Sequence, residues 1–434
     1  MKRQLLYTTI IASLLMFVEE QYIYAQDRGA IWVHGLKDNN AQWNNWATTF
    51  TGERRLATRN QIVNNGSWQD YNSENGVATM ANNVLADYVG NPQNIYFGHS
   101  MGGVVGRQID VNNNGSFGGI ITAGSPLDGA RIANSARNND GDWFVYDGID
   151  RVTRGPIRQF GPISYNILNY SVNGLAALLF PVFDVFGLRN NSNVGVTDLA
   201  ENSSYMNSGI RNSQTNTPKI HIWGNEDGQG FWRLISQAIG NGDDNQYVSV
   251  ANTAGDVYEA AMWVNIGLAI ASSWWTFGFG AIWYAYTAVG WSTGADWWRD
   301  ASDRGWNYLI GSGTPSTNTV CYDALNSQGF NNCMNSSCQG GACNGSNGYS
   351  IYLSCQQQNT YQQCYTYYSS VNGQSDAFIK VPSQQGFSSA WSNNAVKIEA
   401  QGVNHLEMKK HPRIREILNE AFDGQHGAFF NTPR

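Results

Sequence analysis

Charge is scarce in this chain. Charged residues make up 14% of the 434 residues, and the formal net charge is −7. A protein that binds nucleic acid needs a basic face to neutralise phosphates, and this composition does not supply one. The composition therefore excludes nucleic acid as a partner, and nothing in the sequence points to a protein partner.

Histidine is scarce as well, and its distribution bears on metal binding. Only six histidines are present, and none lies between His221 and His405. All six cysteines fall within that gap, from Cys321 to Cys364, so a zinc site built from Cys and His is disfavoured. An even number of clustered cysteines predicts three disulfides, with fifteen connectivities open. Asp243 and Asp244 offer oxygen ligands for calcium, but their spacing is not specific. We therefore expect no cofactor and no catalytic metal.

The first residues have the pattern of an export signal. Lys2 and Arg3 precede an apolar run over residues 5–18, and a short polar stretch leads to Ala25. A membrane anchor is the alternative, but the run is short for a bilayer span and no basic cluster follows it. We expect residues 1–25 to be a cleaved signal peptide and the protein to be secreted or periplasmic.

The rest of the chain alternates strand-like and helix-like segments, which predicts a parallel sheet with crossover helices. We expect a core formed by residues 26–129, 218–227 and 374–434. Residues 130–217 and 228–373 interrupt it as a loop-rich, partly helical insertion and a cap. Expected strands cover residues 30–33, 95–97, 119–123, 219–224, 378–381 and 395–400, and expected helices cover 77–88, 104–111 and a final segment that ends near 422.

The cap has two parts of different composition. Residues 228–312 hold most of the tryptophans, and no charged residue occurs from 260 to 295. This aromatic stretch is compatible with a membrane-spanning helix, with a buried helical pair, or with a lid that contacts lipid transiently. Residues 321–368 are rich in Cys, Asn, Gln and Tyr, and we expect a cluster of loops joined by disulfides.

Two serines share the spacing Gly-x-Ser-x-Gly, Ser100 and Ser292. Ser100 follows an apolar strand and precedes a helix, where small residues allow a sharp turn and the helix N-terminus favours negative charge. Ser292 follows an aromatic, uncharged run with no strand before it. The context therefore favours Ser100 as a nucleophile.

The segments around Ser100 resemble the α/β-hydrolase superfamily. Residues 98–103 resemble its nucleophile elbow, and residues 32–36 (WVHGL) resemble the strand and loop that form its oxyanion hole. Residues 121–129 (ITAGSPLDG) resemble bacterial lipases, and residues 196–203 (VTDLAENS) are similar to secreted lipases and inositol-deacylase-like members. The resemblance covers the core, about half the chain, and implies an α/β-hydrolase fold with a large inserted cap.

In this superfamily the nucleophile is followed in the chain by an acid and then by a histidine. That order leaves His405, His411 and His426 as bases, and His405 is favoured because it lies in a turn between a strand and the last helix. Asp376 is favoured as the acid because residues 373–384 (GQSDAFIKVPSQ) resemble a lipase segment, although the family usually has glycine where this chain has alanine. Asp227, three residues after Gly224, is the alternative acid.

The resemblance also implies a function. The backbone amides of Leu36 and Met101 would form the oxyanion hole, and His34 and His99 would be structural neighbours. The expected activity is hydrolysis of carboxylic esters, as in a lipase or esterase acting on acyl chains, by Ser100, Asp376 and His405. The alternative is a non-catalytic secreted protein that binds lipid or glycan on the same core.

Overall fold

The computed structural model describes residues 29–427 except 38–43, 55, 57–72, 89–92, 114, 139, 161–192, 227, 240–244, 273–278, 326, 339–350, 352–353 and 356. The predicted signal peptide, Asp227, Asp243 and Asp244 lie outside the described residues.

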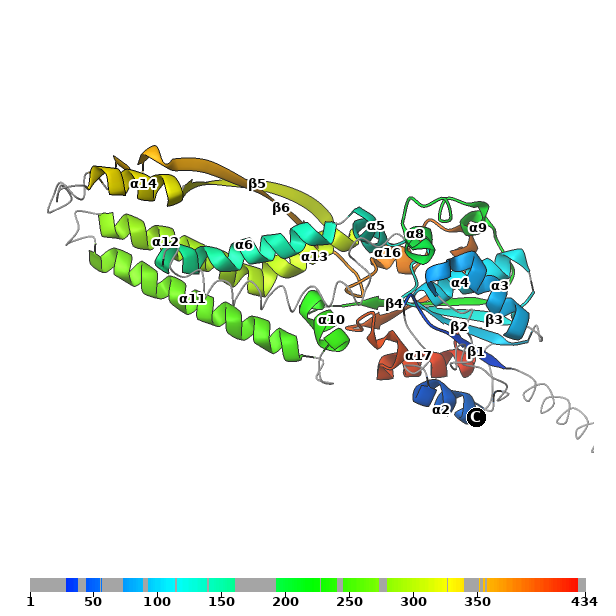
Figure 1. Cartoon of the computed structure of the whole chain (residues 1–434). Coiled ribbons are helices and arrows are strands. Elements are labelled where there is room, and N and C mark those ends of the chain that lie inside the picture. Colours follow the sequence, from blue (N-terminus) through cyan, green and yellow to red (C-terminus); the bar gives the residue numbers. More distant parts are fainter. Residues whose placement is uncertain are drawn as a thin grey trace, which may run out of the picture.

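A five-stranded parallel sheet forms the core (Figure 1). Its strand order is β1-β2-β3-β4-β7, and every neighbouring pair is parallel. The inner strands β2 and β3 are completely buried, as expected for a parallel sheet covered on both faces. The strands are β1 (Ala30–Val33), β2 (Ile95–His99), β3 (Gly119–Ala123), β4 (Lys219–Asn225) and β7 (Ala395–Gln401).

Helices cover both faces of the sheet. On one face, α3 (Val77–Tyr88) and α4 (Met101–Asn112) pack against each other and contribute to one hydrophobic core. On the other face, α2 (Asn44–Glu53) and α17 (Pro412–Phe422) enclose a second core in which Phe50 and Phe422 meet edge to face. The predicted fold class, an α/β-hydrolase fold with a mostly parallel sheet, crossover helices and a large inserted region, is confirmed.

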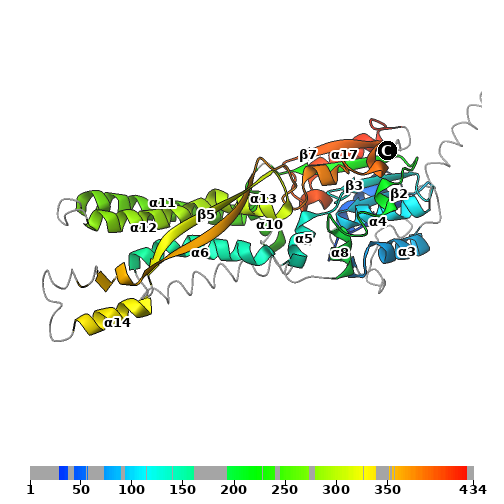
Figure 2. The same cartoon turned by 90° about the horizontal axis from the view of Figure 1, so that it is seen from above.

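The inserted segments form an elongated body that projects beyond one end of the sheet (Figures 1 and 2). Long helices dominate it, and both α6 and α11 pack on α12. The first insertion contributes α6 (Asp140–Phe160) to this body and α5 (Arg131–Asn138) at its junction with the core, whereas α8 (Val194–Leu199) and α9 (Gly209–Asn212) lie beside the sheet, near α4 (Figure 1). The second contributes α10 (Gly230–Ile239), α11 (Gln246–Ser272), α12 (Phe279–Asp296), a π-helical turn (Trp297–Ala301), α13 (Ser302–Ile310), β5 (Thr314–Leu325), α14 (Ser327–Ser337) and β6 (Thr360–Val371).

The aromatic part of the cap is partly core and partly surface. Trp232, Trp297 and Trp306 are fully buried in one cluster, whereas Trp263 and Val264 on α11 are more than half exposed. Among the described helices, none is long and apolar enough to cross a membrane.

The cysteine-rich segment differs from the expected loops. Strands β5 and β6 form a twelve-residue antiparallel ribbon, because Thr, Val, Tyr and Cys favour extended backbone. Cys321 and Cys364 lie directly opposite each other and are bonded, and a second disulfide joins Cys333 to Cys355. Cys338 is disulfide-bonded as well, and no described cysteine is free. The prediction that cysteines of this segment form disulfides is confirmed, and the disulfides indicate an oxidising compartment.

The expected strand at residues 378–381 is wrong. The backbone turns there, because the side chain of Asp376 accepts hydrogen bonds from the amides of Phe378 and Ile379. A short helix, α16 (Val381–Gln384), follows with Pro382 in its first turn. The apolar pair therefore belongs to a loop that surrounds Asp376 at the end of the sheet.

A buried carboxyl group in the cap predicts a pH-dependent stability. Asp303 of α13 accepts a hydrogen bond from the amide of Phe231 (2.8 Å), and burial raises its pKa to about 7. Since the folded pKa exceeds the unfolded value, this group stabilises the fold most at low pH, and that contribution is lost as the pH rises towards 7.

Asp303→Asn keeps an oxygen acceptor and carries no charge. We expect this variant to exceed the wild type in Tm by roughly 2 °C or more at pH 8, and by less at pH 5. Thermal unfolding at both pH values checks this, with Glu416→Gln, at an exposed position on helix α17 of the core, as the control that leaves the pH dependence unchanged. Equal pH dependence in wild type and Asp303→Asn would contradict the assignment.

Candidate active site

Ser100 occupies the sharp turn between β2 and α4. Its backbone has φ 53° and ψ −127°, a strained conformation for a residue with a side chain. Neighbouring glycines permit the turn, because a Cβ at Gly98 would lie 2.5 Å from the carbonyl carbon of Gly102 and one at Gly102 would lie 2.5 Å from the oxygen of Val33. The turn holds the serine at the carboxyl end of the sheet, and the N-terminus of α4 begins at the next residue.

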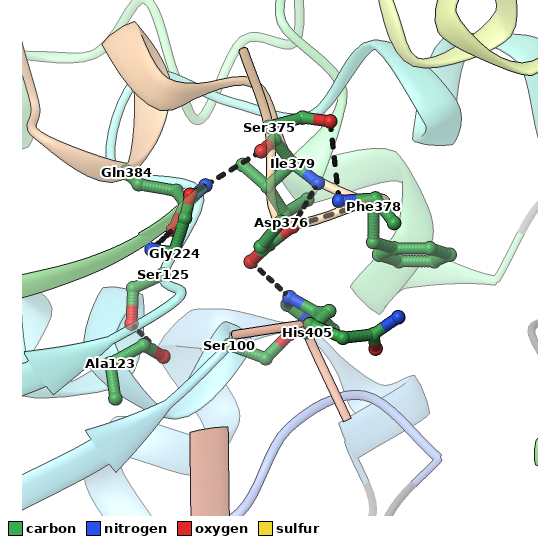
Figure 3. A network of polar contacts seen from close by, with 12 residues as sticks. Ser100, Ala123, Ser125, Gly224, Ser375, Asp376, Phe378, Ile379, Gln384 and His405 are labelled. Atoms are coloured by element: carbon green, nitrogen blue, oxygen red, sulfur yellow. Dashed lines mark hydrogen bonds and ion pairs between the residues drawn. The ribbon is translucent and has the colours of Figure 1, made fainter. Parts of the chain in front are cut away.

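A hydrogen-bonded chain links Ser100 to His405 and Asp376 (Figure 3). The hydroxyl of Ser100 lies 3.1 Å from Nε2 of His405, and Nδ1 of His405 lies 2.7 Å from Oδ2 of Asp376. The three residues are 7%, 3% and 0% exposed, respectively. If Nδ1 donates to the carboxylate, Nε2 is left as an acceptor for the serine proton, which is the arrangement that a general base requires.

The loop around Asp376 fixes the carboxylate. Its Oδ1 accepts hydrogen bonds from the amides of Phe378 (3.0 Å) and Ile379 (2.6 Å), so Oδ2 remains directed at His405. Ala377 has a left-handed φ of 67°, at the position where the family usually has glycine. The indole of Trp306, from the cap helix α13, donates a hydrogen bond to the carbonyl of Ala377 (2.6 Å).

Two buried polar side chains support this arrangement. Gln384 accepts from the amide of Gly224 (2.8 Å) and donates to the carbonyl of Ile379 (2.7 Å), which ties the Asp376 loop to the end of β4. His99 lies 2.9 Å from the carbonyl oxygen of His405 through Nε2, and burial lowers its pKa well below the usual range. A neutral His99 can donate to that carbonyl and orient the His405 loop. The sequence analysis included Gln384 in the lipase-like segment 373–384 but assigned it no role. Its place in that segment was the only signal for it in the sequence.

The segments named for the oxyanion hole lie next to Ser100. Met101 is the first residue of α4. Leu36 lines the same pocket as Ser100, and a Cβ at Gly35 would lie only 2.7 Å from Cβ of Ser100. The loop therefore passes close to the serine.

An apolar pocket of about 30 Å³ opens at Ser100. Apart from Ser100 itself, all its lining side chains are apolar. They come from the loop after β1, the loop after β3, the helices α5 and α8, and the Asp376 loop. The lining residues are Leu36, Pro126, Ala130, Ile132, Ala133, Ala136, Val196, Leu199, Phe378 and Ile379. The pocket holds little more than a water molecule in this conformation, and its walls suit a hydrocarbon group.

The other candidates are not part of this cluster. Ser292 lies inside α12, and its hydroxyl donates to the carbonyl of Val289. His411 caps the N-terminus of α17, and His426 faces Glu420. Across the described ranges, no group of three or more His, Cys, Asp or Glu residues could hold a metal ion.

Gly124, which follows β3, is a position that sequence reasoning missed. It has φ 57°, and a Cβ there would lie 2.9 Å from Oδ2 of Asp376 and 3.2 Å from Nδ1 of His405. For the ester hydrolysis that the sequence predicts, we expect Gly124→Ala to lower kcat about 10²-fold, because the methyl group would push Asp376 and His405 apart. Steady-state kinetics checks this against Gly115→Ala, where φ is also positive (86°) but the space is open. If both variants lost kcat equally, the cause would be backbone strain and not the contact of the methyl group with Asp376 and His405.

No protein-family model matches the sequence, and no curated protein matches it. Among solved structures, the crystal structure of Bacillus licheniformis lipase BlEst2 in its mature form is similar over 50% of this chain and 76% of that chain. The sequence identity is 17% and the TM-score is 0.29. At these values the similarity says nothing about the activity or the substrate of this chain.

Proposed function

We propose that the protein is a secreted or periplasmic serine hydrolase that cleaves carboxylic esters of acyl chains. The observation that carries the proposal is the hydrogen-bonded chain from Ser100 through His405 to Asp376. The disulfides support an exported protein, and the apolar pocket at Ser100 supports an acyl group as the part of the substrate that is bound.

In the proposed reaction, Oγ of Ser100 attacks the ester carbonyl while Nε2 of His405 takes its proton. Asp376 stabilises the imidazolium that forms, and the amides of Leu36 and Met101 stabilise the oxyanion. His405 then returns the proton to the leaving alcohol, which leaves an acyl group on Ser100. Water, activated by His405, releases the acid and restores the serine.

Two measurements on the signal-free protein test the proposal. A fluorophosphonate probe should label the folded protein, and peptide mass spectrometry should place the label on Ser100. A series of p-nitrophenyl esters should be hydrolysed, with short acyl chains preferred because the pocket is small. A folded protein that takes no label and hydrolyses no ester would overturn the proposal in favour of a non-catalytic protein that binds lipid or glycan.

A further inference from the structure

The cap contains a second, much larger cleft. It has a volume of about 840 Å³ and lies between the helices α6, α12 and α13 and the strands β5 and β6. Figures 1 and 2 show these strands alongside the cap helices, beyond the end of the parallel sheet. The cleft shares no residue with the pocket at Ser100, and its volume is within the range of ligand-binding sites.

The wall formed by β5 and β6 is held covalently. Cys321 lines the cleft and is bonded to Cys364 on the opposite strand. A side chain on this wall therefore needs little reordering when a ligand binds, which lowers the entropic cost of binding.

Three guanidinium groups line the cleft: those of Arg151, Arg154 and Arg304. Arg151 donates from Nε to Asp147 (2.9 Å) and from Nη1 to Asp296 (3.3 Å). Its guanidinium carbon lies 4.2 Å from the centre of the Tyr367 ring. Arg151 is thus fixed by carboxylates and an aromatic ring before any ligand arrives.

The other two arginines are held in the same way. Arg304 donates from Nη2 to Asp296 (2.8 Å). Arg154 donates hydrogen bonds from Nη2 to the carboxylate of Asp150 and to the hydroxyl of Tyr367. A planar guanidinium that is held in place presents its remaining N–H groups in a fixed geometry, which suits carboxylates and sulfates.

Some donors on the walls of the cleft are unused. Asp296 lines the cleft, and Asp147 and Asp150 also pair with its arginines, so the three guanidinium charges are balanced by three carboxylates. Within the part of the chain that the structure describes, Nη2 of Arg151 and Nη1 of Arg304 make no hydrogen bond, and neither does the side-chain amide of Asn318. These unused N–H groups favour a ligand rich in oxygen acceptors, and carboxylate and sulfate groups match the geometry of a guanidinium.

We propose that this cleft binds an acidic saccharide, one that carries carboxylate or sulfate groups. Its volume greatly exceeds that of a single small anion, so the anionic group must belong to a larger polar body. Hydroxyl groups also line the cleft; they belong to Ser292, Thr293, Ser316, Ser369 and Tyr368. The hydroxyls of Ser292 and Thr293 donate to the carbonyl of Val289, and those of Ser316 and Ser369 bond to each other, so their oxygens can still accept from sugar hydroxyls. The site would hold the protein on an acidic polysaccharide while leaving Ser100 open.

Affinity electrophoresis in native gels tests the proposal. The gels contain polygalacturonate, dextran sulfate or neutral dextran. Because the protein has a net charge of −7, non-specific attraction to the two polyanions is disfavoured. We expect at least one polyanion to retard the wild type and neutral dextran to leave its mobility unchanged.

Arg304→Gln should weaken the retardation at least tenfold in apparent Kd, and Arg299→Gln is its matched control. Arg299 is also a cap arginine with two carboxylate partners, Asp256 and Glu259, but it lies outside the cleft. Asn318→Trp, at an exposed position on β5, offers a second test, because the indole would fill the cleft without removing an ion pair.

Three results would overturn the proposal. They are no retardation by either polyanion, equal retardation by neutral dextran, and unchanged binding of both cleft variants. Because Ser100→Ala should bind like the wild type, failure of this site is distinguishable from failure of the proposed ester hydrolysis.

Discussion

Ser100→Ala is expected to lower kcat for ester hydrolysis by at least about 10⁴-fold. The hydroxyl of Ser100 is the group that His405 contacts through Nε2, and no other hydroxyl of the described pocket lining could replace it. The residual rate would come from binding and from the oxyanion hole. Since the side chain is small and the change removes one buried oxygen, the fold should be retained.

Ser292→Ala is the matched control, because Ser292 has the same Gly-x-Ser-x-Gly spacing but lies inside a helix. We expect its kcat for a small ester to stay within about twofold of the wild type, because Ser292 lies outside the pocket at Ser100. The comparison uses p-nitrophenyl butyrate under saturating conditions. A Ser100→Ala protein that keeps a tenth of the wild-type rate would exclude Ser100 as the nucleophile.

Asp376→Asn is expected to lower kcat about 10⁴-fold with little change in KM. The side-chain oxygen of an asparagine would still accept hydrogen bonds from the amides of Phe378 and Ile379, so the conformation of the loop should persist. Its NH₂ group would then face Nδ1 of His405 and donate to it. That contact moves the imidazole proton to Nε2, which leaves no base for the serine hydroxyl.

Asp227→Asn distinguishes the two candidate acids. It should keep kcat near the wild-type value if Asp376 acts as the acid. Measuring kcat and KM separately for both variants completes the test, because loss of the acid should lower kcat and leave KM nearly unchanged. A large loss in Asp227→Asn together with a mild one in Asp376→Asn would reverse the assignment.

The features that the sequence predicted well are local ones. The turn at Ser100 depends on neighbouring glycines and on a strand followed by a helix, and all of these can be recognised within ten residues. The sheet strands were recognisable for the same reason, since buried parallel strands are short apolar runs. The expectation that Ser100, Asp376 and His405 act together stays a prediction about chemistry, although the three side chains meet.

The features that the sequence did not predict depend on distant contacts. The segment at residues 378–381 has the composition of a strand, yet the side chain of Asp376 bonds to its amides and turns the chain. The ribbon of β5 and β6 pairs residues that are 43 positions apart at the disulfide. The contact of Gly124 with Asp376 and His405 joins three separate loops, so no local pattern could reveal it.

The hydrogen bond from Trp306 to the carbonyl of Ala377 has a consequence for how this protein could be shortened. Trp306 belongs to the inserted cap, yet it supports the residue that follows Asp376. Deleting the cap would leave that carbonyl without its donor and the left-handed alanine without its support. The insertion is therefore no detachable module: a minimal version of this protein would have to keep α13, or carry glycine at position 377.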